Sequence, residues 1–510
     1  MKKEPDVQLS FWRDSVELPQ FKQLGQNIDT EVVVVGAGIV GIMNAYQLAL
    51  KGYDVTLIEG DEILSGTTQN TTARITAQQG LLYGQLSKQM DEEKARSYYD
   101  SQMKAIDEIE RLVDKHEIDC DFKRLNSVVY AVHEDSIKDL EKEAEVYRTL
   151  GIDGYLSKGE LKLPFETTSE LVMKNQAEFH PLKFLKAILG IATASGVKVF
   201  EHTRAKSVED DTLYTADGNS INFNHMVIAT HFPFLDMEGF YFNSFKIGYG
   251  YGLVVTSTTP PPDDVSLSGH DGAGLSIRNI VNPSRSASTV LFGGLGHMSY
   301  EDKDMNKQIE TLKLYADLKT INDEVLYSYR AQDLMTADSL PFIGQFDKSH
   351  DNRYVATGFN KFGMTNGVLS SMIIRDLITG DDNDYTKLLD PHRKKPTFQQ
   401  MKQHITNPIH VVESEAKHMT ESHPDLKTLE IDSGQGTVAS DGMTKKGVYR
   451  EDDDYYIVSN RCTHMGCSLG WNGSDKTWDC PCHGSRFNYD GKVIEGPAVD
   501  DLDMEIKRFE

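Results

Sequence analysis

The stretch Val32-Val-Val-Val-Gly36-Ala-Gly38-Ile-Val-Gly41 decides the fold of the first part of the chain. It continues into an apolar segment, residues 42–50, and then a second apolar run, residues 55–58. This order predicts a strand, a glycine turn, a helix and a second strand. The stretch is therefore interpreted as a βαβ unit that binds a dinucleotide.

Each glycine of this turn has an expected task. Gly36 would allow the tight turn, Gly38 would let the backbone approach a pyrophosphate at the helix N-terminus, and Gly41 would let helix and strand pack closely. Glu59 follows the second apolar run directly. A carboxylate there accepts ribose hydroxyls and disfavours a 2′-phosphate, so we expect Glu59 to bind the ribose.

Two short loops near the C-terminus combine cysteine with histidine. Residues 462–467 read Cys-Thr-His-Met-Gly-Cys, residues 480–487 read Cys-Pro-Cys-His-Gly-Ser-Arg-Phe, and four of the five cysteines lie here. Each loop offers a thiolate and an imidazole, so two irons can be held asymmetrically, with sulfur ligands on one iron and nitrogen ligands on the other. The pattern predicts a 2Fe-2S cluster bound by Cys462, His464, Cys480 and His483.

A structural zinc site of two cysteines and two histidines is the alternative, and the ligand types alone allow it. Such a site has no use for Cys467 and Cys482, which are the remaining cysteines of the two loops. The cluster is therefore favoured over zinc.

The two loops resemble the Rieske proteins of cytochrome bc complexes. The resemblance implies that Cys467 and Cys482 form a disulfide that ties the loops together over the cluster. It also implies that Ser485 could donate a hydrogen bond to sulfur, and Phe487 stands where high-potential members carry a tyrosine. Because the cytosol reduces most disulfides, such a bridge would have to be shielded by the surrounding loops.

The composition is that of a globular protein of about three domains. The 510 residues carry a net charge of −25, which makes a nucleic-acid or anionic-membrane partner unfavourable. The sequence shows no signal-peptide pattern and no apolar run of membrane-spanning length. We therefore expect a cytoplasmic protein without a membrane span.

Four regions are expected along the chain. Residues 1–29 are polar, with Phe11 and Trp12 as apolar anchors, and predict an arm lying on a folded domain. The other predicted regions are an FAD-dependent oxidoreductase domain (30–395), a linker (396–424) and a Rieske domain (425–510). The predicted fold class is a Rossmann-like α/β FAD-binding domain of the glutathione-reductase type with an antiparallel substrate sheet, followed by an all-β Rieske domain.

The loop of residues 65–74 is dense in hydroxyl groups and favours FAD over NAD. Thr71 and Thr72 are expected to lie along the flavin and its phosphates. The alternative is a polar surface loop. Strand-like runs between residues 236 and 330 predict a mostly antiparallel sheet over the substrate pocket.

Residues 329–344 and 355–367 resemble the C-terminal signature of the D-amino-acid oxidase and glycine oxidase family of FAD enzymes, and the resemblance covers roughly residues 30–393. It implies that Gly358, Gly363, Met364 and Thr365 lie at the flavin, with backbone N–H groups stabilising negative charge on the reduced ring. Residues 61–80 contain no histidine, and the C-terminal half of this domain contains no cysteine. The FAD is therefore expected to be non-covalent.

Asp333 falls where glycine-oxidase-like enzymes carry an arginine that holds the substrate carboxylate. A carboxylate at this position would attract an ammonium group, so Asp333 is the candidate catalytic residue that faces the substrate. The alternative is that Asp333 pairs with Arg330 or caps a turn.

These features predict a dehydrogenase that oxidises an amine-like small molecule and passes electrons from flavin through the Rieske cluster to an acceptor protein or quinone. One alternative is an oxygen-using oxidase with a regulatory cluster. Another is a non-catalytic redox sensor or electron carrier.

The remaining cysteine and a group of histidines are given structural roles. Cys120 is predicted to be a buried structural thiol. His404, His410, His418 and His423 are irregularly spaced and have no cysteine nearby, which favours solvated or packing roles over a metal site.

Overall fold

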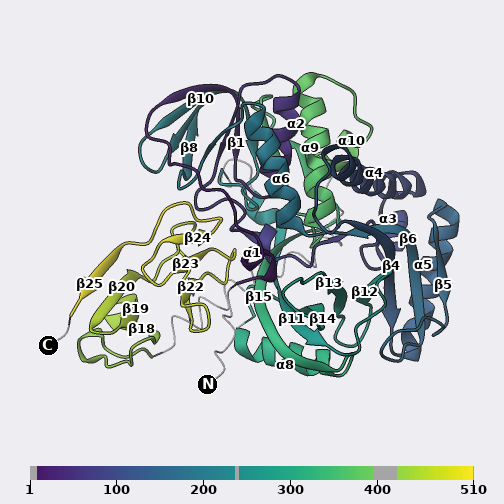
Figure 1. The fold of residues 1–510 in the computed structure, drawn as a ribbon. Coiled ribbons are helices and arrows are strands. Elements are labelled where there is room, and N and C mark those ends of the chain that lie inside the picture. The colour runs from purple at the N-terminus through teal and green to yellow at the C-terminus, as the bar shows by residue number, and fades with distance from the viewer. Residues whose placement is uncertain (1–8, 236–240, 302, 394–421, 509–510) are drawn as a thin grey trace. The chain divides into compact units, whose positions relative to one another are not determined.

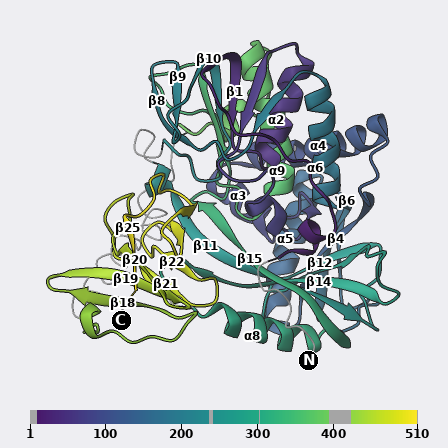
Figure 2. The ribbon, with the colours of Figure 1, turned by 60° about the vertical axis from the view of Figure 1, so that its left-hand side comes forward.

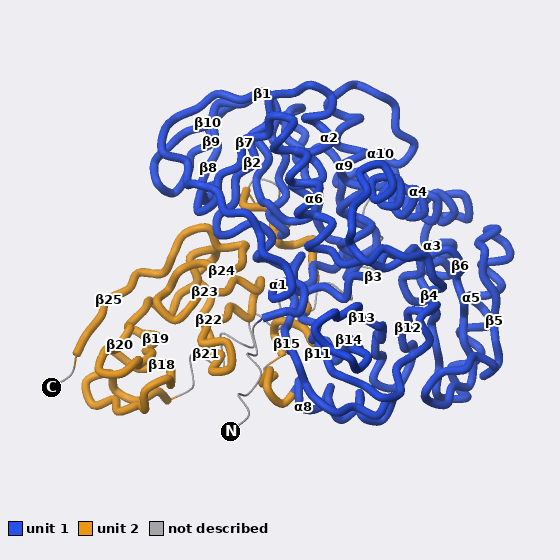
Figure 3. Tube along the Cα trace, viewed as in Figure 1, with its two compact units in different colours: residues 1–231, 249–296, 308–395 blue, residues 232–248, 297–307, 396–510 orange. Residues whose placement is uncertain are grey.

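The computed structural model describes residues 9–235, 241–301, 303–393 and 422–508. The chain forms two compact units, shown in Figure 3. Unit 1 comprises residues 1–231, 249–296 and 308–395, and unit 2 comprises residues 232–248, 297–307 and 396–510. Unit 2 thus takes in two short segments that precede the Rieske region in sequence. Most of the predicted linker, with His404, His410 and His418, lies outside the described residues.

The first sheet of unit 1 is built around the predicted βαβ unit (Figure 1). Its strands follow the order β16-β17-β10-β1-β2-β7, and the hairpin of β8 and β9 joins it at β10. β1 pairs in parallel with both β2 and β10. The four valines of β1 are at most 3% exposed, because a central parallel strand is covered on both faces. The strands are β1 Ile28–Val35, β2 Val55–Ile58, β7 Lys198–Phe200, β8 Ala205–Glu209, β9 Thr212–Thr215, β10 Ser220–Ile228, β16 Phe342–Gln345 and β17 Arg353–Thr357.

Helices α2 (Ile39–Leu50), α6 (Pro181–Ala194) and α9 (Gly363–Thr379) accompany this sheet. Both α6 and α9 pack against α2, as Figures 1 and 2 show. Gly367 makes the close approach of α9 possible, since a Cβ there would lie 2.9 Å from Cγ2 of Ile39. The remaining helices of unit 1 are α1 Phe11–Asp14, α3 Leu82–Gln89, α4 Glu92–His116, α5 Ile137–Leu150 and α10 Thr386–Leu389, and α8 Met305–Asp317 begins in unit 2.

The second sheet has nine strands in the order β15-β11-β14-β13-β12-β4-β6-β3, with β5 paired to β6. The described pairings are antiparallel except that of β12 with β4. The sequence predicted this sheet from strand-like runs between residues 236 and 330. In the structure, strands from residues 74–178 also belong to it. The strands are β3 Arg74–Ile75, β4 Lys123–Ala131, β5 Gly154–Ser157, β6 Ser169–Glu178, β11 Phe245–Ser257, β12 Val265–Gly269, β13 Ser276–Ile280, β14 Ser288–Met298 and β15 Asn322–Thr336.

Unit 2 contains two small antiparallel sheets, β18-β19-β20-β25 and β21-β22-β23-β24. Trp471 and Trp478 face each other across β21 and β22, with ring centroids 4.7 Å apart. Trp478 is fully buried and requires a glycine at 447, where a Cβ would lie 2.8 Å from its ring. The strands are β18 Gly436–Asp441, β19 Thr444–Glu451, β20 Asp454–Ser459, β21 Gly470–Asn472, β22 Thr477–Asp479, β23 Arg486–Asn488, β24 Val493–Glu495 and β25 Met504–Lys507.

The N-terminal arm is anchored on unit 1 by α1. Phe11 and Trp12 are 3% and 1% exposed, and their rings meet edge to face at 5.3 Å. Further along, the backbone N–H of Phe21 donates to the Glu201 carboxylate at 2.6 Å. The arm is therefore part of the folded unit, held by both apolar and polar contacts.

Candidate functional site

The glycine turn after β1 leaves no room for side chains. Gly36 has φ +104°, and a Cβ there would lie 2.6 Å from the carbonyl oxygen of Ala229. A Cβ at Gly41 would lie 1.7 Å from the carbonyl oxygen of Gly36. α2 begins after Gly38, which has no side chain to cap the helix. The N–H of Ile39 donates to Oγ1 of Thr68 at 3.1 Å, so a phosphate at this helix start would meet the N–H groups that follow Ile39. The geometry fits the tasks predicted for the three glycines.

Glu59 lies at the end of β2 and is partly buried. Its carboxylate accepts hydrogen bonds from the backbone N–H groups of Ala37 at 2.7 Å and Asp61 at 3.0 Å. Burial raises the pKa of this carboxyl group despite these bonds. The side chain is thus tied to the glycine turn, which is the position that ribose binding requires.

The hydroxyl-rich loop carries polar atoms without partners. Oε1 of Gln69 and Oδ1 of Asn70 are buried, and neither has a hydrogen-bond partner within the described residues. Buried polar atoms normally have partners, so such atoms suit a bound polar ligand. Thr72 of this loop packs over β14, since a Cβ at Gly293 would lie 2.8 Å from its methyl group.

The backbone of this loop is held by side chains from distant parts of unit 1. The Thr71 carbonyl accepts hydrogen bonds from Nε1 of Trp12 at 2.8 Å and from the Tyr329 hydroxyl at 2.9 Å. Arg278 donates to the Ala73 carbonyl at 2.7 Å and stacks over the Trp12 ring at 5.5 Å. The N-terminal arm therefore helps to fix the loop that is predicted to lie along the flavin.

The N-terminus of α9 is built like that of α2. Phe362 precedes it without a side-chain cap, and Met364 and Thr365 are 5% and 1% exposed. The Thr365 hydroxyl is buried and has no hydrogen-bond partner in the part of the chain that the structure describes. Gly358 follows β17 with φ +70° and opens the loop that leads to Gly363. These residues, the glycine turn and the loop of residues 65–74 fit FAD, because Gln69, Asn70 and Thr365 leave buried polar atoms for a ligand.

Asp333 lies on β15 and is partly buried. Because side chains alternate along a strand, Asp333 shares a face with Tyr329, which contacts the Thr71 carbonyl. Glycines on neighbouring β11 leave space on this face: a Cβ at Gly250 would lie 3.7 Å from Oδ2 of Asp333. Burial raises the pKa of Asp333 to about 6, and the nearby Lys361 ammonium opposes that rise.

Lys361 is a charged residue of this region that the sequence reasoning missed. Its backbone has φ +74°, and the preceding Asn360 has φ +50°, a conformation that is uncommon outside glycine. Asn360 is held to the end of β15, because its Oδ1 accepts from the Thr336 N–H at 2.9 Å and its N–H donates to the Leu334 carbonyl at 3.2 Å. The sequence signal that could have identified Lys361 is its position as a cation within the glycine-rich sequence Gly-Phe-Asn-Lys-Phe-Gly.

In unit 2, the two loops bring the predicted cluster ligands together. The rings of His464 and His483 lie edge to face with centroids 5.1 Å apart. The thiol of Cys480 lies within hydrogen-bonding reach of Cys462 and is the main cause of a Cys462 pKa lowered to about 6. Burial lowers the pKa of His483 to about 4, which keeps its imidazole neutral, as metal binding requires. Nδ1 of His483 is buried and has no partner within the described residues, so it is available to a metal.

The loops are joined by a disulfide between Cys467 and Cys482, with Cα atoms 6.6 Å apart. The backbone closes each loop, since Gly466 donates to the Cys462 carbonyl and Gly484 to the Cys480 carbonyl. The bridge also brings the sulfur atoms of Cys467, Cys480 and Cys482 within 4.8 Å of one another. These three cysteines are not a separate metal site, because a disulfide removes two of the three thiolates.

Ser485 is fully buried beside the cluster loops. Its hydroxyl accepts from the Ala498 N–H at 3.0 Å and also lies within hydrogen-bonding reach of the Cys462 sulfur, where it helps to lower the pKa of that thiol. Phe487 is fully buried in the same apolar cluster as the loop cysteines. These positions suit residues that tune a bound cluster.

Comparison with known proteins identifies both parts of the chain. The family described as "DAO: FAD dependent oxidoreductase" matches residues 31–377, and the "Rieske [2Fe-2S] domain" matches residues 422–509. The chain is 34% identical over 503 residues to the "Putative Rieske 2Fe-2S iron-sulfur protein YhfW" of Bacillus subtilis, covering 97% of this chain and 96% of that protein. It is also 24% identical over 384 residues to the "Probable oxidoreductase OrdL" of Haemophilus influenzae, covering 71% of this chain and 86% of the other.

Among solved structures, glycine oxidase from Geobacillus kaustophilus superposes with a TM-score of 0.60 at 17% identity, covering 72% of this chain and 99% of that chain. L-proline dehydrogenase from P. horikoshii gives a TM-score of 0.58 at 18% identity, covering 72% and 98%. At these identities the likeness concerns the fold.

The chain belongs to the DAO family of FAD-dependent oxidoreductases. It is, more particularly, a member in which that domain is joined to a C-terminal Rieske domain. The predicted fold class, the oxidoreductase class and the two cofactors, FAD and a 2Fe-2S cluster, are confirmed. The assignment of individual cofactor-binding residues stays a prediction that the geometry supports.

Three further features bear on the predictions. Cys120 is 1% exposed, and burial raises its pKa to about 12, as suits a structural thiol.

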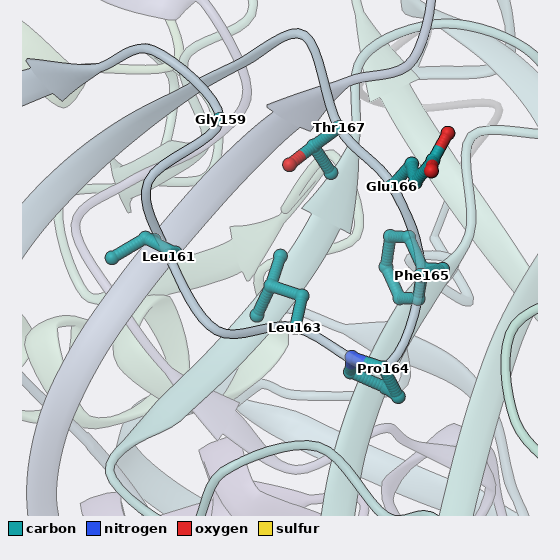
Figure 4. A pocket seen from close by; sticks show the side chains of 7 residues that line it. All are labelled: Gly159, Leu161, Leu163, Pro164, Phe165, Glu166 and Thr167. Carbon is teal, nitrogen blue, oxygen red and sulfur yellow. The ribbon is translucent and has the colours of Figure 1, made fainter.

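Figure 4 shows a surface hollow on the loop between β5 and β6, and none of the predicted site residues lines it. No helix among the described residues is long and apolar enough to cross a membrane. The hollow is lined by Gly159, Leu161, Leu163, Pro164, Phe165, Glu166 and Thr167.

Proposed function

We propose that the protein is a dehydrogenase that oxidises a small amine and delivers the electrons through its own Rieske cluster to an acceptor protein or quinone. The observation that carries the substrate class is the Asp333 carboxylate on the half-buried face of β15. Within the described residues, this carboxylate forms neither a hydrogen bond nor an ion pair, so it is available to a ligand. An anion in such a place selects a cationic or N–H-donating group.

Asp333 is proposed to act on the substrate nitrogen in two ways. Its carboxylate accepts a hydrogen bond from the ammonium group, which orients the adjacent C–H bond. With a pKa of about 6, it can also take one proton, leaving the neutral amine that hydride loss requires. Loss of a hydride from the neutral amine then gives an iminium ion.

When bound, FAD accepts that hydride, which carries two electrons, and the 2Fe-2S cluster carries electrons one at a time. The chain's own residues hold these groups. Gly36, Gly38 and Glu59 are proposed for the nucleotide half of FAD, and Thr72 and Thr365 for the flavin half. Cys462, His464, Cys480 and His483 are proposed as the cluster ligands.

Lys361 completes the proposed substrate pocket. Its ammonium group lies 3.2 Å from the position that a Cβ would occupy at Gly296 of β14, a strand next to β11. A pocket with Asp333 and Lys361 offers one anion and one cation. An amine that also bears a polar group can satisfy both residues. A simple amino acid held by its carboxylate at position 333 is not expected, because the Asp333 carboxylate would repel it.

The experiment is an anaerobic screen of the FAD- and cluster-loaded protein with primary amines, secondary amines and amino acids. We expect an amine to bleach the flavin and then to produce the electron paramagnetic resonance signal of the reduced cluster. Asp333→Asn should weaken binding of that amine by about 10- to 100-fold, the value of a hydrogen bond to a charged group. Asp323→Asn makes the same change at an exposed position of β15 and serves as the control.

Three results would contradict the proposal. Efficient flavin reduction by glycine, unaltered in Asp333→Asn, would show that Asp333 does not meet the substrate. Stoichiometric hydrogen peroxide in air with an unreduced cluster would support the oxidase alternative, and no flavin reduction by any compound would favour a carrier or sensor.

A further inference from the structure

The chain between β10 and β11 makes an unexpected contribution to unit 2. Residues 232–248 belong to this unit, although the strands before and after them lie largely in unit 1 (Figure 3). We call the described residues 232–235 and 241–248 the aromatic loop. Phe232 and Phe245 meet at 5.6 Å, and Tyr241 stacks on Phe245 at 6.2 Å. All three rings are buried, so the loop has an apolar core of its own.

The aromatic loop contacts the Rieske domain at two places. The ring of Phe242 lies edge to face with His464 at 5.9 Å and with His483 at 5.5 Å. Phe232 packs at the loop of residues 495–498, since a Cβ at Gly496 would lie 3.5 Å from its own Cβ. These distances and angles are those of ordinary aromatic packing.

Phe242 therefore lies against the side chains that are expected to face outward from the cluster. Nδ1 of His483 is buried and available to iron, which leaves Nε2 as the outer atom of that ring. We call the outer sides of the His464 and His483 rings the histidine edge. An electron partner of the cluster would approach it at this edge, because the cysteine side of the site is buried.

We propose that the aromatic loop is a built-in docking element for the histidine edge, with Phe242 as its contact residue. The edge is then covered by a segment of the protein's own chain. The loop continues directly into β11, the strand that carries Gly250 beside Asp333. The proposal rests on the ligand assignment in the proposed function and extends it to the partner of the cluster.

The test is carbethoxylation by diethyl pyrocarbonate at alkaline pH. The reagent acylates unprotonated ring nitrogens, so an iron-bound imidazole reacts at Nε2 once that atom has lost its proton to the solvent. The oxidised, cluster-loaded protein is treated, and modification of His464 and His483 is measured by peptide mass spectrometry. His202, whose side chain is 57% exposed, is the reference histidine in every sample. Loss of two edge-to-face ring contacts should raise the exposed population, so Phe242→Ala should react about tenfold faster than the wild type at both histidines.

Two further variants separate shielding from misfolding. Phe242→Leu keeps apolar bulk at the edge and should stay near the wild-type rate. Tyr456→Ala removes an aromatic ring that packs on Tyr489 at 5.0 Å and should leave both rates unchanged. Visible absorbance and acid-labile sulfide, measured before treatment, establish that each variant carries its cluster.

Equal rates for wild type and Phe242→Ala, both near the rate of His202, would overturn the docking proposal while the cluster remains intact. A wrong ligand assignment would appear differently, since replacing His464 or His483 would then leave the cluster absorbance unchanged. Neither measurement uses an amine or an electron acceptor, so failure of the proposed substrate class is distinguished from both.

Discussion

Replacing Asp333 by asparagine should stabilise unit 1 while it impairs substrate binding. Burial raises the pKa of this carboxyl group from 3.8 to about 6, so the folded state disfavours its charge. Because the pKa is raised, the contribution of Asp333 to folding stability is fully present below pH 3.8, where the carboxyl group is protonated. That contribution is lost as the pH rises through 6. Above pH 7, this pKa difference corresponds to a loss of about 3 kcal/mol in the free energy of unfolding. Because water reaches part of the side chain, we expect a loss of about 1–3 kcal/mol.

The assay is thermal unfolding of the loaded protein at pH 8 and at pH 5, with the wild type and Asp323→Asn measured in parallel. Asp333→Asn should raise the melting temperature by about 2–5 °C at pH 8, and the gain should fall to about half at pH 5. Asp323→Asn lies at an exposed position and should change neither value. A lower melting temperature for Asp333→Asn at pH 8, or a gain that grows at pH 5, would refute the reasoning.

Three other outcomes are expected. The purified protein should contain one FAD and one 2Fe-2S cluster, and zinc without acid-labile sulfide would contradict the cluster assignment. The reduction potential of the cluster should lie below the top of the Rieske range of roughly −150 to +300 mV. Phe487→Tyr should raise this potential in a redox titration. No change, or a fall, would mean that the side chain does not reach the cluster. Trp12→Phe should hardly alter FAD affinity, because Tyr329 still donates to the Thr71 carbonyl, whereas adding Tyr329→Phe should weaken it about tenfold in a titration of the apoprotein. Equal losses in the single and double variants would show that the shared carbonyl does not position the loop.

The sequence predicted the parts of the molecule whose structure depends on local pattern. Four consecutive valines followed by spaced glycines define a buried strand and a tight turn, and Glu59 lies where that pattern placed it. The cysteine and histidine loops are equally local, because each ligand pair is two or three residues apart. The fold class could therefore be obtained without coordinates.

What the sequence could not provide depends on contacts between distant residues. Phe242 falls in a stretch that reads as part of the substrate sheet, and its approach to His464 leaves no local signal. The pairing of β4 with β12, which extends the substrate sheet, is also long-range. Lys361 was visible in the sequence, but its proximity to Asp333 depends on how Asn360 is held at the end of β15.

The positions of the three tryptophans provide an intrinsic fluorescence probe for each of the two units. Trp12 is the tryptophan of unit 1, and Trp471 and Trp478 form a close pair in unit 2. Trp12 donates to the Thr71 carbonyl of the loop that is proposed to lie along FAD, so its emission should fall when FAD binds, whereas the paired indoles report on unit 2. A variant that keeps only Trp12, or only the pair, would allow the unfolding of each unit to be followed separately by fluorescence without an attached dye.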